Sequence, residues 1–423
     1  MRVHTIGIAV VIATLAIGFG IGQTGQVTIQ FSTWEAGALA DYWPAKVQEF
    51  QRANPGIRID LLVNPDQYEP TILRLIAANA APDVMQLFEV TVPILAERGN
   101  IHDLTSLITR DRFDITDFIG STLSLARFRD GLYGLGSDVN PQIMYYNIDL
   151  FEQAGVPLPT AEWTWNDLIA AARAITRDTT GDGRLDRWGV GWWWLPSGAW
   201  WVPALIQVWN NGGDMYAADL SRTRLNEPAA VQALQRWSDL IHRDRVSPNA
   251  SEIGGSNVNA LFQQGRLGIY LDGTWNIATF ENLPFRWDVA PIPAAPGVAR
   301  TTFLHTSYYS ISRTTRNLEA SWRWLQFIVN RDAQQWRSSN LRYLPTRQSV
   351  NVLAPFVRAD RPPRNARLIS DVLPSARMAT VAPNNDRIIQ IFERELTLVY
   401  LGEKAAQQAM NDAAREINNL LAR

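Results

Sequence analysis

The chain contains no cysteine among its 423 residues. It therefore has no disulfide, no thiolate nucleophile, no zinc site built on cysteine and no cysteine that could carry a lipid anchor. Net charge is only −2 and no basic stripe is present, which argues against a nucleic-acid partner. Histidine is scarce as well, and its scatter disfavours a histidine-based metal site or catalytic triad: the residues are His4, His102, His242 and His305.

The sequence has one long apolar run, and it lies near the N-terminus. Arg2 and His4 precede an apolar run at 6–21, and the small residue Gly22 follows it. This layout is typical of a secretory signal peptide, to which we assign 1–24. The run is near the lower length for a membrane span, so an uncleaved N-terminal anchor is the alternative. Both interpretations predict that the mature chain lies outside the cytoplasm, in the periplasm or the extracellular space.

The length of the chain makes two or three domains the expectation. Its first part alternates period-2 and period-3.6 patterns, which predict strands at 27–31, 57–63 and 83–88 with helices at 39–53 and 71–79 between them. This β-α-β-α-β order predicts an α/β fold with a mainly parallel sheet. Ligands of such sheets bind outside the carboxyl ends of the strands, which carry here Trp34, Glu35, Asp66, Tyr68 and Glu89.

The chain is predicted to pass from a first lobe to a second one at 137–140. Pro141 disfavours helical backbone at the residue before it, so this stretch is expected to be extended. We interpret it as a hinge strand with ligand bound beside it, which makes two of its residues candidate ligand contacts: Asp138 and Asn140. The extended segment 303–312 is the natural second crossing, and its paired tyrosines contribute the candidate Tyr308.

Tryptophan is abundant, with 17 residues, and seven of them fall within 188–209. Most are expected to pack between helices and sheet. One core cannot easily cover both faces of a run of indoles, so at least one is expected to line the cleft, and the candidate is Trp194. The turn after a predicted strand at 267–271 carries two more candidates, Asp272 and Trp275. An indole face suits the apolar face of a sugar ring, and its N–H can meet a hydroxyl.

The segment 178–186, DTTGDGRLD, resembles the first nine positions of an EF-hand calcium loop. The pattern departs at position twelve, where Gly189 stands in place of the usual bidentate glutamate. A structural Ca²⁺ remote from the ligand is one hypothesis, and a surface turn that binds no metal is the other. Oxygen-bearing side chains stand at positions one, three, five and nine of the pattern: Asp178, Thr180, Asp182 and Asp186.

Segments spread over nearly the whole mature chain carry a family resemblance: VTIQFSTWEAG, FQRANPGIRIDLL, APDVMQL, DGLYGLGSDVNPQIMYYNIDLFEQAGV, TWNDL, FQQGRLGIYLDGTWNI, DVAPIPAAPG, SYYSISRTTRNLEASWRWLQFIV and LPTR. In their order and spacing they resemble the extracellular solute-binding proteins of bacterial ABC importers, in the sugar-binding group that includes maltose-binding protein. DTTGDGRLD resembles a loop of some members. The lipobox cysteine that many relatives carry is missing, which leaves free or peptide-anchored forms.

The resemblance implies a periplasmic-binding-protein-like fold, in which two α/β lobes are joined by hinge strands, close on the ligand by rotation and end in C-terminal helices. It places lobe one at about 27–138 plus 303–350, and lobe two at about 139–302 plus 351–423. Trp275 matches the position of a stacking aromatic in sugar-binding members. Matching loops and the matching hinge hold the remaining candidates: Trp34, Glu35, Asp66, Glu89, Asp138 and Asn140, with Arg347 in LPTR.

The function that this resemblance implies is that of an extracytoplasmic component of an ABC importer. It would bind a sugar or oligosaccharide and deliver it to the membrane permease subunits, as a monomer without enzymatic activity or a required cofactor. A secreted glycosidase is one alternative, with Asp138 and either Glu35 or Glu89 as its two carboxylates, although the strand order does not read as eight repeats. A binding protein for a non-sugar, such as a polyamine or oligopeptide, is the other.

Overall fold

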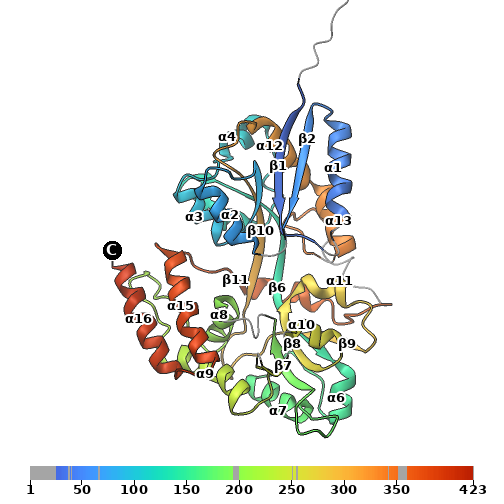
Figure 1. Ribbon diagram of the computed structural model, residues 1–423, viewed down its shortest axis with the longest axis vertical. Coiled ribbons are helices and arrows are strands. Elements are labelled where there is room, and N and C mark those ends of the chain that lie inside the picture. Colours follow the sequence, from blue (N-terminus) through green and yellow to red (C-terminus); the bar gives the residue numbers. More distant parts are fainter. Residues whose placement is uncertain are drawn as a thin grey trace, which may run out of the picture.

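The computed structural model describes residues 25–36, 39, 41–64, 67–193, 200–249, 251–253, 256–341, 343–350 and 360–422. The signal-peptide segment 1–24 and the candidates Asp66 and Trp194 lie outside these ranges. Figure 1 shows two α/β lobes, one above the other, connected by the long strands β6 (Leu135–Asn147) and β10 (Thr302–Ile311). None of the helices in the described ranges combines the length and apolar character that a membrane crossing needs.

Each lobe has a hydrophobic core of its own. One core gathers buried residues from 29–135 and 308–341, and we call the part of the chain around it lobe one. The other gathers buried residues from 139–304 and 344–420, and the part around it is lobe two. Two such cores are what the length of the chain leads one to expect, because single cores stop growing beyond about 250–300 residues.

Lobe one is built on the β-α-β-α-β order that the sequence predicts. Strand β1 (Val27–Thr33) pairs in parallel with β2 (Ile57–Val63) and with β3 (Val84–Phe88). Helices α1 (Tyr42–Ala53) and α2 (Tyr68–Ala77) lie between these strands in the chain. The remaining elements are α3 (Thr91–Glu97), α4 (Thr105–Asp111), α5 (Gly120–Leu125), β4 (Arg127–Phe128), β5 (Gly131–Leu132), α12 (Leu318–Ile328) and α13 (Arg331–Leu341).

Aromatic side chains fill the core of lobe one. Phe31 of β1 contacts Trp43 of α1, Tyr309 of β10 and Trp324 of α12, with ring centroids 4.8, 5.7 and 5.4 Å apart. All three contacts are edge-on, the arrangement that the charge distribution of aromatic rings favours. These contacts join elements that are far apart in the sequence and hold α12 against the sheet.

The strands β6 and β10 run side by side and antiparallel between the lobes, and we call the region where they pass from one core to the other the crossing. Every residue of both strands is buried. Along β6 the core changes between Leu135 and Val139, and along β10 it changes between Leu304 and Tyr308. The stretch 137–140, predicted as a hinge strand, lies within this part of β6.

The sheet as a whole is mixed. It is parallel away from the crossing, in the pairs that β1 makes with β2 and β3 and in the pair of β7 (Trp188–Trp192) with β8 (Leu267–Gly273). It is antiparallel where β10 pairs with β3 and β6, and where β6 pairs with β8 and β9 (Trp287–Ala290). One of the two crossing strands takes the chain to lobe two and the other brings it back, so they run in opposite directions.

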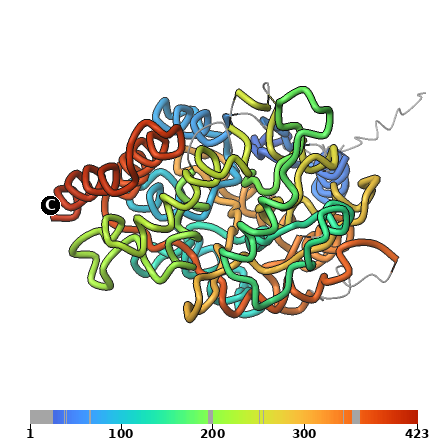
Figure 2. The backbone as a smooth tube through the Cα atoms, turned by 90° about the horizontal axis from the view of Figure 1, so that it is seen from below, coloured from blue at the N-terminus to red at the C-terminus, as the bar shows by residue number. Residues whose placement is uncertain are grey.

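Lobe two is rich in helices. Its C-terminal helices α15 (Asn385–Tyr400) and α16 (Ala406–Leu421) pack together and against α9 (Pro228–His242), and Figure 2 shows this group at one side of the molecule. Helix α15 also contacts α8 (Trp201–Trp209). The other elements are α6 (Ile148–Ala154), α7 (Trp165–Ile175), α10 (Val258–Gln263), η2 (Thr274–Asn276), α11 (Ile277–Phe280), α14 (Leu368–Asp371), η3 (Leu373–Ser375) and β11 (Ala376–Arg377).

The tryptophan-rich segment contributes strand β7 and helix α8. Trp188 and Trp192 on β7 are fully buried, and Trp192 packs edge-on against Trp237 of α9 at 5.3 Å. Every residue of α8 is buried as well. Trp193 and Trp200 are only half-buried and contact each other edge-on at 5.1 Å. Most of the described indoles of this segment therefore pack in the core, and Trp200 is left beside the crossing.

Candidate functional site

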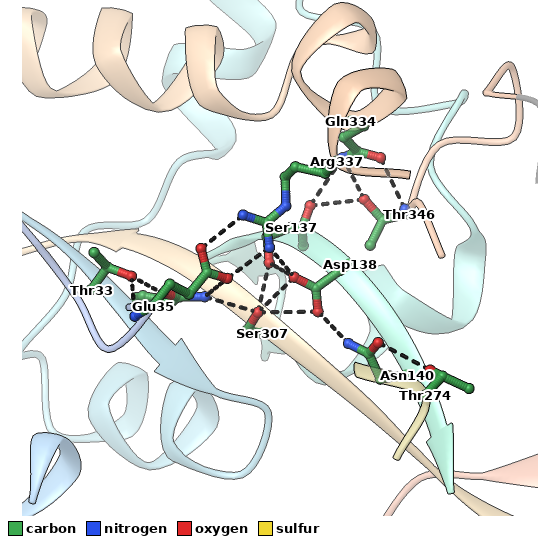
Figure 3. Close-up of polar contacts among 12 residues, drawn as sticks. Thr33, Glu35, Ser137, Asp138, Asn140, Thr274, Ser307, Gln334, Arg337 and Thr346 are labelled. Carbon is green, nitrogen blue, oxygen red and sulfur yellow. Dashed lines mark hydrogen bonds and ion pairs between the residues drawn. The ribbon is translucent and has the colours of Figure 1, made fainter. Parts of the chain in front are cut away.

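A buried ion cluster lies where β6 passes from lobe one to lobe two (Figure 3). Arg337 of α13 donates through Nη1 and Nη2 to the two carboxylate oxygens of Glu35, at 2.8 and 2.7 Å. Its Nη2 also donates to Asp138 Oδ2 at 2.8 Å. The three side chains are at most 5% exposed. One guanidinium thus holds the loop after β1, strand β6 and helix α13 together.

Neutral donors complete the hydrogen bonding of the two carboxylates. Burial raises the pKa of Asp138, and the neighbouring Arg337 opposes this shift. A buried charge without partners costs several kcal/mol, so these contacts compensate the burial of the two carboxylates. Trp43 and Gln86 donate to Glu35 at 3.0 Å each, and Ser137, Asn140 and Ser307 donate to Asp138 at 2.5–3.3 Å.

Asn140 extends this cluster into lobe two. Its Oδ1 accepts a hydrogen bond from Thr274 Oγ1 at 3.1 Å, as Figure 3 shows. Thr274 opens the turn η2, which also carries Trp275. The structure therefore brings together candidates that the sequence places in three separate segments: Glu35, Asp138 with Asn140, and Trp275.

Trp275 is half-buried at this turn, and a glycine positions its ring. A Cβ built on Gly273 would come within 2.2 Å of the indole, so any other residue there would displace the ring. The indole lies edge-on to the ring of His305, with centroids 5.4 Å apart. The exposed part of the indole remains available for contact at the crossing.

His305 connects Glu89 with two indoles. Its Nδ1 lies 3.1 Å from Glu89 Oε1, and its ring stacks on Trp200 with centroids 5.5 Å and planes 10° apart. In the sheet it lies opposite Asn140. Glu89 itself is 3% exposed, and its Oε2 has no hydrogen-bond partner among the described residues. The candidate Glu89 thus also reaches the crossing, through a histidine that the sequence did not single out.

Asp272 holds the turn that precedes Trp275. Its Oδ1 accepts from the backbone N–H of Gly273 at 2.7 Å, and its Oδ2 accepts from Tyr270 and from Asn276, both at 2.5 Å. Burial raises its pKa to about 7, although these donors oppose the shift. The carboxyl of Asp272 therefore supports the geometry of the turn from inside.

Trp34 and Tyr68 lie together near the end of β1. Trp34 is half-buried, stacks on Phe88 at 4.5 Å and contacts Tyr68 edge-on at 5.2 Å. The hydroxyl of Tyr68 donates to the carbonyl of Ser32 at 3.0 Å, and the side chain is 6% exposed. Tyr68 thus supports Trp34, whose indole is the more accessible of the two.

Two further candidates lie in the interior of lobe one. The hydroxyl of Tyr308 donates to the carbonyl of Thr122, and Tyr308 is fully buried. Arg347 pairs with Asp117 at 3.1 Å and covers the ring of Phe118 at 4.2 Å. Because the hydroxyl of Tyr308 and the buried guanidinium of Arg347 are engaged within the lobe, we assign both residues a structural role and leave them out of the proposed site.

The carboxylates of the loop 178–186 are engaged within the loop, as the hypothesis of a metal-free turn expects. Asp178 accepts hydrogen bonds from the backbone N–H groups of Thr180, Gly181 and Gly183, at 2.7–3.1 Å. Asp186 accepts from the backbone N–H of Thr179, and Asp182 from that of Arg184. Each of these carboxylates therefore accepts from amides of its own loop. Within the described ranges, no group of three or more histidine or acidic side chains could hold a metal ion.

The most engaged residue at the crossing, Arg337, gives no signal in the sequence. It lies on α13, a helix of mostly polar sequence whose buried face includes Gln334, Arg337 and Ser338. Periodicity identifies buried faces by apolar residues, so this face is read as exposed. The sequence pointed to His305 only indirectly, because this residue lies in the segment 303–312 that was predicted to form the second crossing and that is β10 in the structure.

Comparison with known proteins gives consistent results. Residues 36–335 match the family described as bacterial extracellular solute-binding proteins. In sequence, the chain is 25% identical over 405 residues to a binding protein of Brucella abortus, with 94% of each chain covered. It is 24% identical over 336 residues to the arabinooligosaccharide-binding protein of Bacillus subtilis, covering 76% of this chain and 73% of that one.

Among solved structures, the fold resembles an ABC substrate-binding protein from Listeria monocytogenes in complex with cycloalternan. The TM-score is 0.85 and the sequences are 25% identical, with 94% of this chain and 99% of that chain covered. The two-lobed architecture described above is thus shared over nearly the whole length of both chains.

Proposed function

Since the chain belongs to the family of bacterial extracellular solute-binding proteins, we propose that it is the substrate-binding component of an ABC importer and binds a sugar or oligosaccharide between its lobes. The names of its relatives support this proposal, since they include an arabinooligosaccharide-binding protein and a protein in complex with cycloalternan. In this role the protein works outside the cytoplasm, as a monomer, and delivers its ligand to the membrane permease subunits.

The observation that carries the proposal is the half-buried indole of Trp275 at the crossing. It lies edge-on to His305, which stacks on the second half-buried indole, Trp200. Indole faces suit the apolar C–H faces of sugar rings, and hydrogen-bonding side chains beside them suit the hydroxyls. Glu89 and Asn140 supply such polar groups here, and Trp34 adds a third indole from lobe one.

The proposed site also has a supporting layer. Glu35, Asp138 and Asp272 are buried and engaged with protein donors, so they position their neighbours and fix the strands at the crossing. Asp66 and Trp194 remain proposed ligand contacts on the basis of the sequence. Closure is proposed to occur by rotation about β6 and β10, with lobe one near 27–138 plus 303–350 and lobe two near 139–302 plus 351–423.

We propose that the bound sugar is not cleaved. A glycosidase needs one carboxyl to protonate the leaving group and another to attack or to activate water. Glu35 and Asp138 both bind Arg337, which leaves this pair unsuited to proton transfer. Incubation with the best oligosaccharide ligand should therefore release no new reducing ends, and steady protein-dependent release would support the glycosidase alternative.

The proposed site is tested with Trp275→Ala. A stacked aromatic contributes about 0.5–1.5 kcal/mol beyond its area, and lost apolar contact adds a few kcal/mol, so the variant should bind sugar about 10²-fold more weakly by calorimetry. Trp336→Ala is the matched control, because Trp336 is also partly exposed and stacks on one aromatic ring, Tyr42, outside the crossing. Near-normal affinity of Trp275→Ala together with a large loss of melting temperature would mean that Trp275 is a core residue.

A further inference from the structure

Three glutamates from the two lobes influence one another through their charges. Glu69 lies on α2 and Glu89 follows β3, both in lobe one, while Glu393 lies on α15 in lobe two. Burial and the charge of Glu89 raise the pKa of Glu69, although Thr91 opposes the shift. Burial and the charge of Glu69 raise the pKa of Glu393 to about 7. The charges of Glu69 in lobe one and Glu393 in lobe two therefore act on each other.

Hydrogen bonds place Glu89 and Glu393 near the indoles at the crossing and link Glu69 to the segment that follows Glu89. Thr91, two residues after Glu89, donates its hydroxyl to Glu69. The backbone N–H of Trp201 donates to Glu393 Oε1 at 3.2 Å, so this carboxylate lies next to Trp200 in the chain. The ring of His305, which lies against Trp200, reaches Glu89 at 3.1 Å.

No arginine or lysine among the described residues forms an ion pair with any of these three carboxylates. Some buried carboxylates of the chain are paired with a cation, since Glu35 and Asp138 bind Arg337 and Glu395 binds Lys404, and the buried Asp272 is satisfied by three neutral donors. Among the described residues Glu89 is the least compensated of the three, because its side chain is 4% exposed, its only ionisable partner there is a histidine and its Oε2 has no hydrogen-bond partner there. A buried carboxylate oxygen of this kind calls for a donor, and a cationic donor compensates it best.

Building on the proposed function, we propose that the sugar ligand carries a protonated amine, as an amino sugar does. Carboxylates beside the faces of aromatic rings are a favourable setting for an ammonium group, because both attract positive charge. The ammonium group would lie between Glu89 and the carboxylates Glu69 and Glu393, and the sugar ring would lie against Trp200 or Trp275. A neutral sugar would leave this excess of negative charge uncompensated.

The test compares neutral sugars with their 2-amino counterparts by isothermal titration calorimetry. The pairs are glucose with glucosamine, galactose with galactosamine, and cello-oligosaccharides with chitosan oligosaccharides of equal length. Measurement at about pH 6.5 keeps the amine protonated, since an α-amino group has a pKa near 7.7. We expect at least one amino member to bind about tenfold more tightly than its neutral partner, and added salt to reduce this preference.

Two isosteric variants localise the effect. Glu69→Gln and Glu393→Gln should each reduce the preference for the amino sugar severalfold, with little change in the binding of a neutral sugar. Glu97→Gln is the control, because Glu97 is an exposed glutamate on α3 of the same lobe as Glu69. It should leave the preference unchanged.

The outcomes separate this inference from the proposed function. If neutral sugars bind and no amino counterpart binds more tightly, the inference is wrong while the proposed function stands. The inference would also be wrong if a neutral sugar binds with uptake of a proton by the protein and binds more weakly as the pH rises through about 7. The carboxyl groups would then be protonated in the complex and would act as neutral donors to the sugar. If no saccharide of either kind binds or raises the melting temperature, the proposed function itself fails.

Discussion

Arg337 determines whether two buried carboxylates at the crossing are compensated. It contributes three charge-assisted hydrogen bonds, and its guanidinium also lies over the rings of Tyr42, Trp43 and Tyr343 at 5.0–5.9 Å. Such a cluster is weak evidence for net stability, because removing three groups from water costs much of what their attraction returns. Removing only one partner of the cluster is strongly destabilising, because the remaining charges stay buried without compensation.

We therefore expect Arg337→Met to lower the free energy of unfolding by about 3–5 kcal/mol, measured by urea denaturation. The variant leaves Glu35 and Asp138 buried without a cation. Adding Glu35→Gln and Asp138→Asn to it removes the uncompensated charge and should recover part of the loss. A triple variant that is no more stable than Arg337→Met would show that packing, not charge, makes Arg337 important.

A second prediction at the scale of one residue concerns pH. The pKa of Asp272 is about 7 in the folded chain, against about 3.9 for an unperturbed aspartate. Between these values the folded state binds more protons than the unfolded state, so stability falls as the pH rises from about 4 to about 7. Glu393, with a pKa of about 7, acts with the same sign over a similar range.

Asp272→Asn should flatten this decline without abolishing it, because Glu393 still titrates. The measurement is the free energy of unfolding in urea at about pH 5 and about pH 7.5, compared with that of the wild type. Asp182→Asn, in an exposed loop, is the control and should keep the wild-type slope. An Asp272→Asn variant with an unchanged slope would contradict the raised pKa.

At the scale of the element, strands were predicted better than the contacts between them. Periodicity located β1, β2 and β3, and a proline with its flanking apolar residues located the central part of β6, because these are local properties of the chain. Helix α8 was missed, since all of its residues are buried and a helix without a polar face gives no amphipathic signal. The cluster around Arg337 depends on pairing between segments far apart in sequence, which no local pattern encodes.

In the acidic loop 178–186, for which a structural Ca²⁺ and a metal-free turn are the two hypotheses, the carboxylates hydrogen-bond to the loop itself. Its glycines at 181 and 183 have positive φ angles of 78° and 85°, as a tight turn requires, and its carboxylates hydrogen-bond the amides that this turn exposes. These backbone donors lower the pKa of Asp178. A calcium loop would need the same oxygens to converge on one point.

We therefore expect EDTA to leave the melting temperature of the protein unchanged. Asp178→Ala should lower the melting temperature by a small amount whether or not EDTA is present, because it removes acceptors for three backbone N–H groups. Differential scanning calorimetry with and without added calcium measures both effects. A fall in the melting temperature of the wild type on chelation would restore the structural-ion hypothesis.

At the scale of the whole molecule, two cores are joined by two strands that are buried along their entire length. Rotation of one lobe against the other is therefore expected to involve small changes spread along β6 and β10, with both cores kept intact. The lobes also meet away from the crossing, where Arg98, the residue that follows α3, pairs with Asp386 of α15 at 2.9 Å. Both residues of this pair line a groove of about 720 Å³ between the lobes.

The pair of Arg98 and Asp386 can form only when the lobes are close together, so it should favour the closed state slightly. Its side chains are 53% and 37% exposed, and exposed pairs are worth about 0.2–1 kcal/mol. Asp386→Ala should therefore weaken ligand binding by at most about fivefold and increase the radius of gyration of the unliganded protein in X-ray scattering. Glu319→Ala, which removes an exposed pair with Arg110 inside lobe one, should change neither quantity. A loss of affinity near a hundredfold for Asp386→Ala would instead mean that this carboxylate touches the ligand.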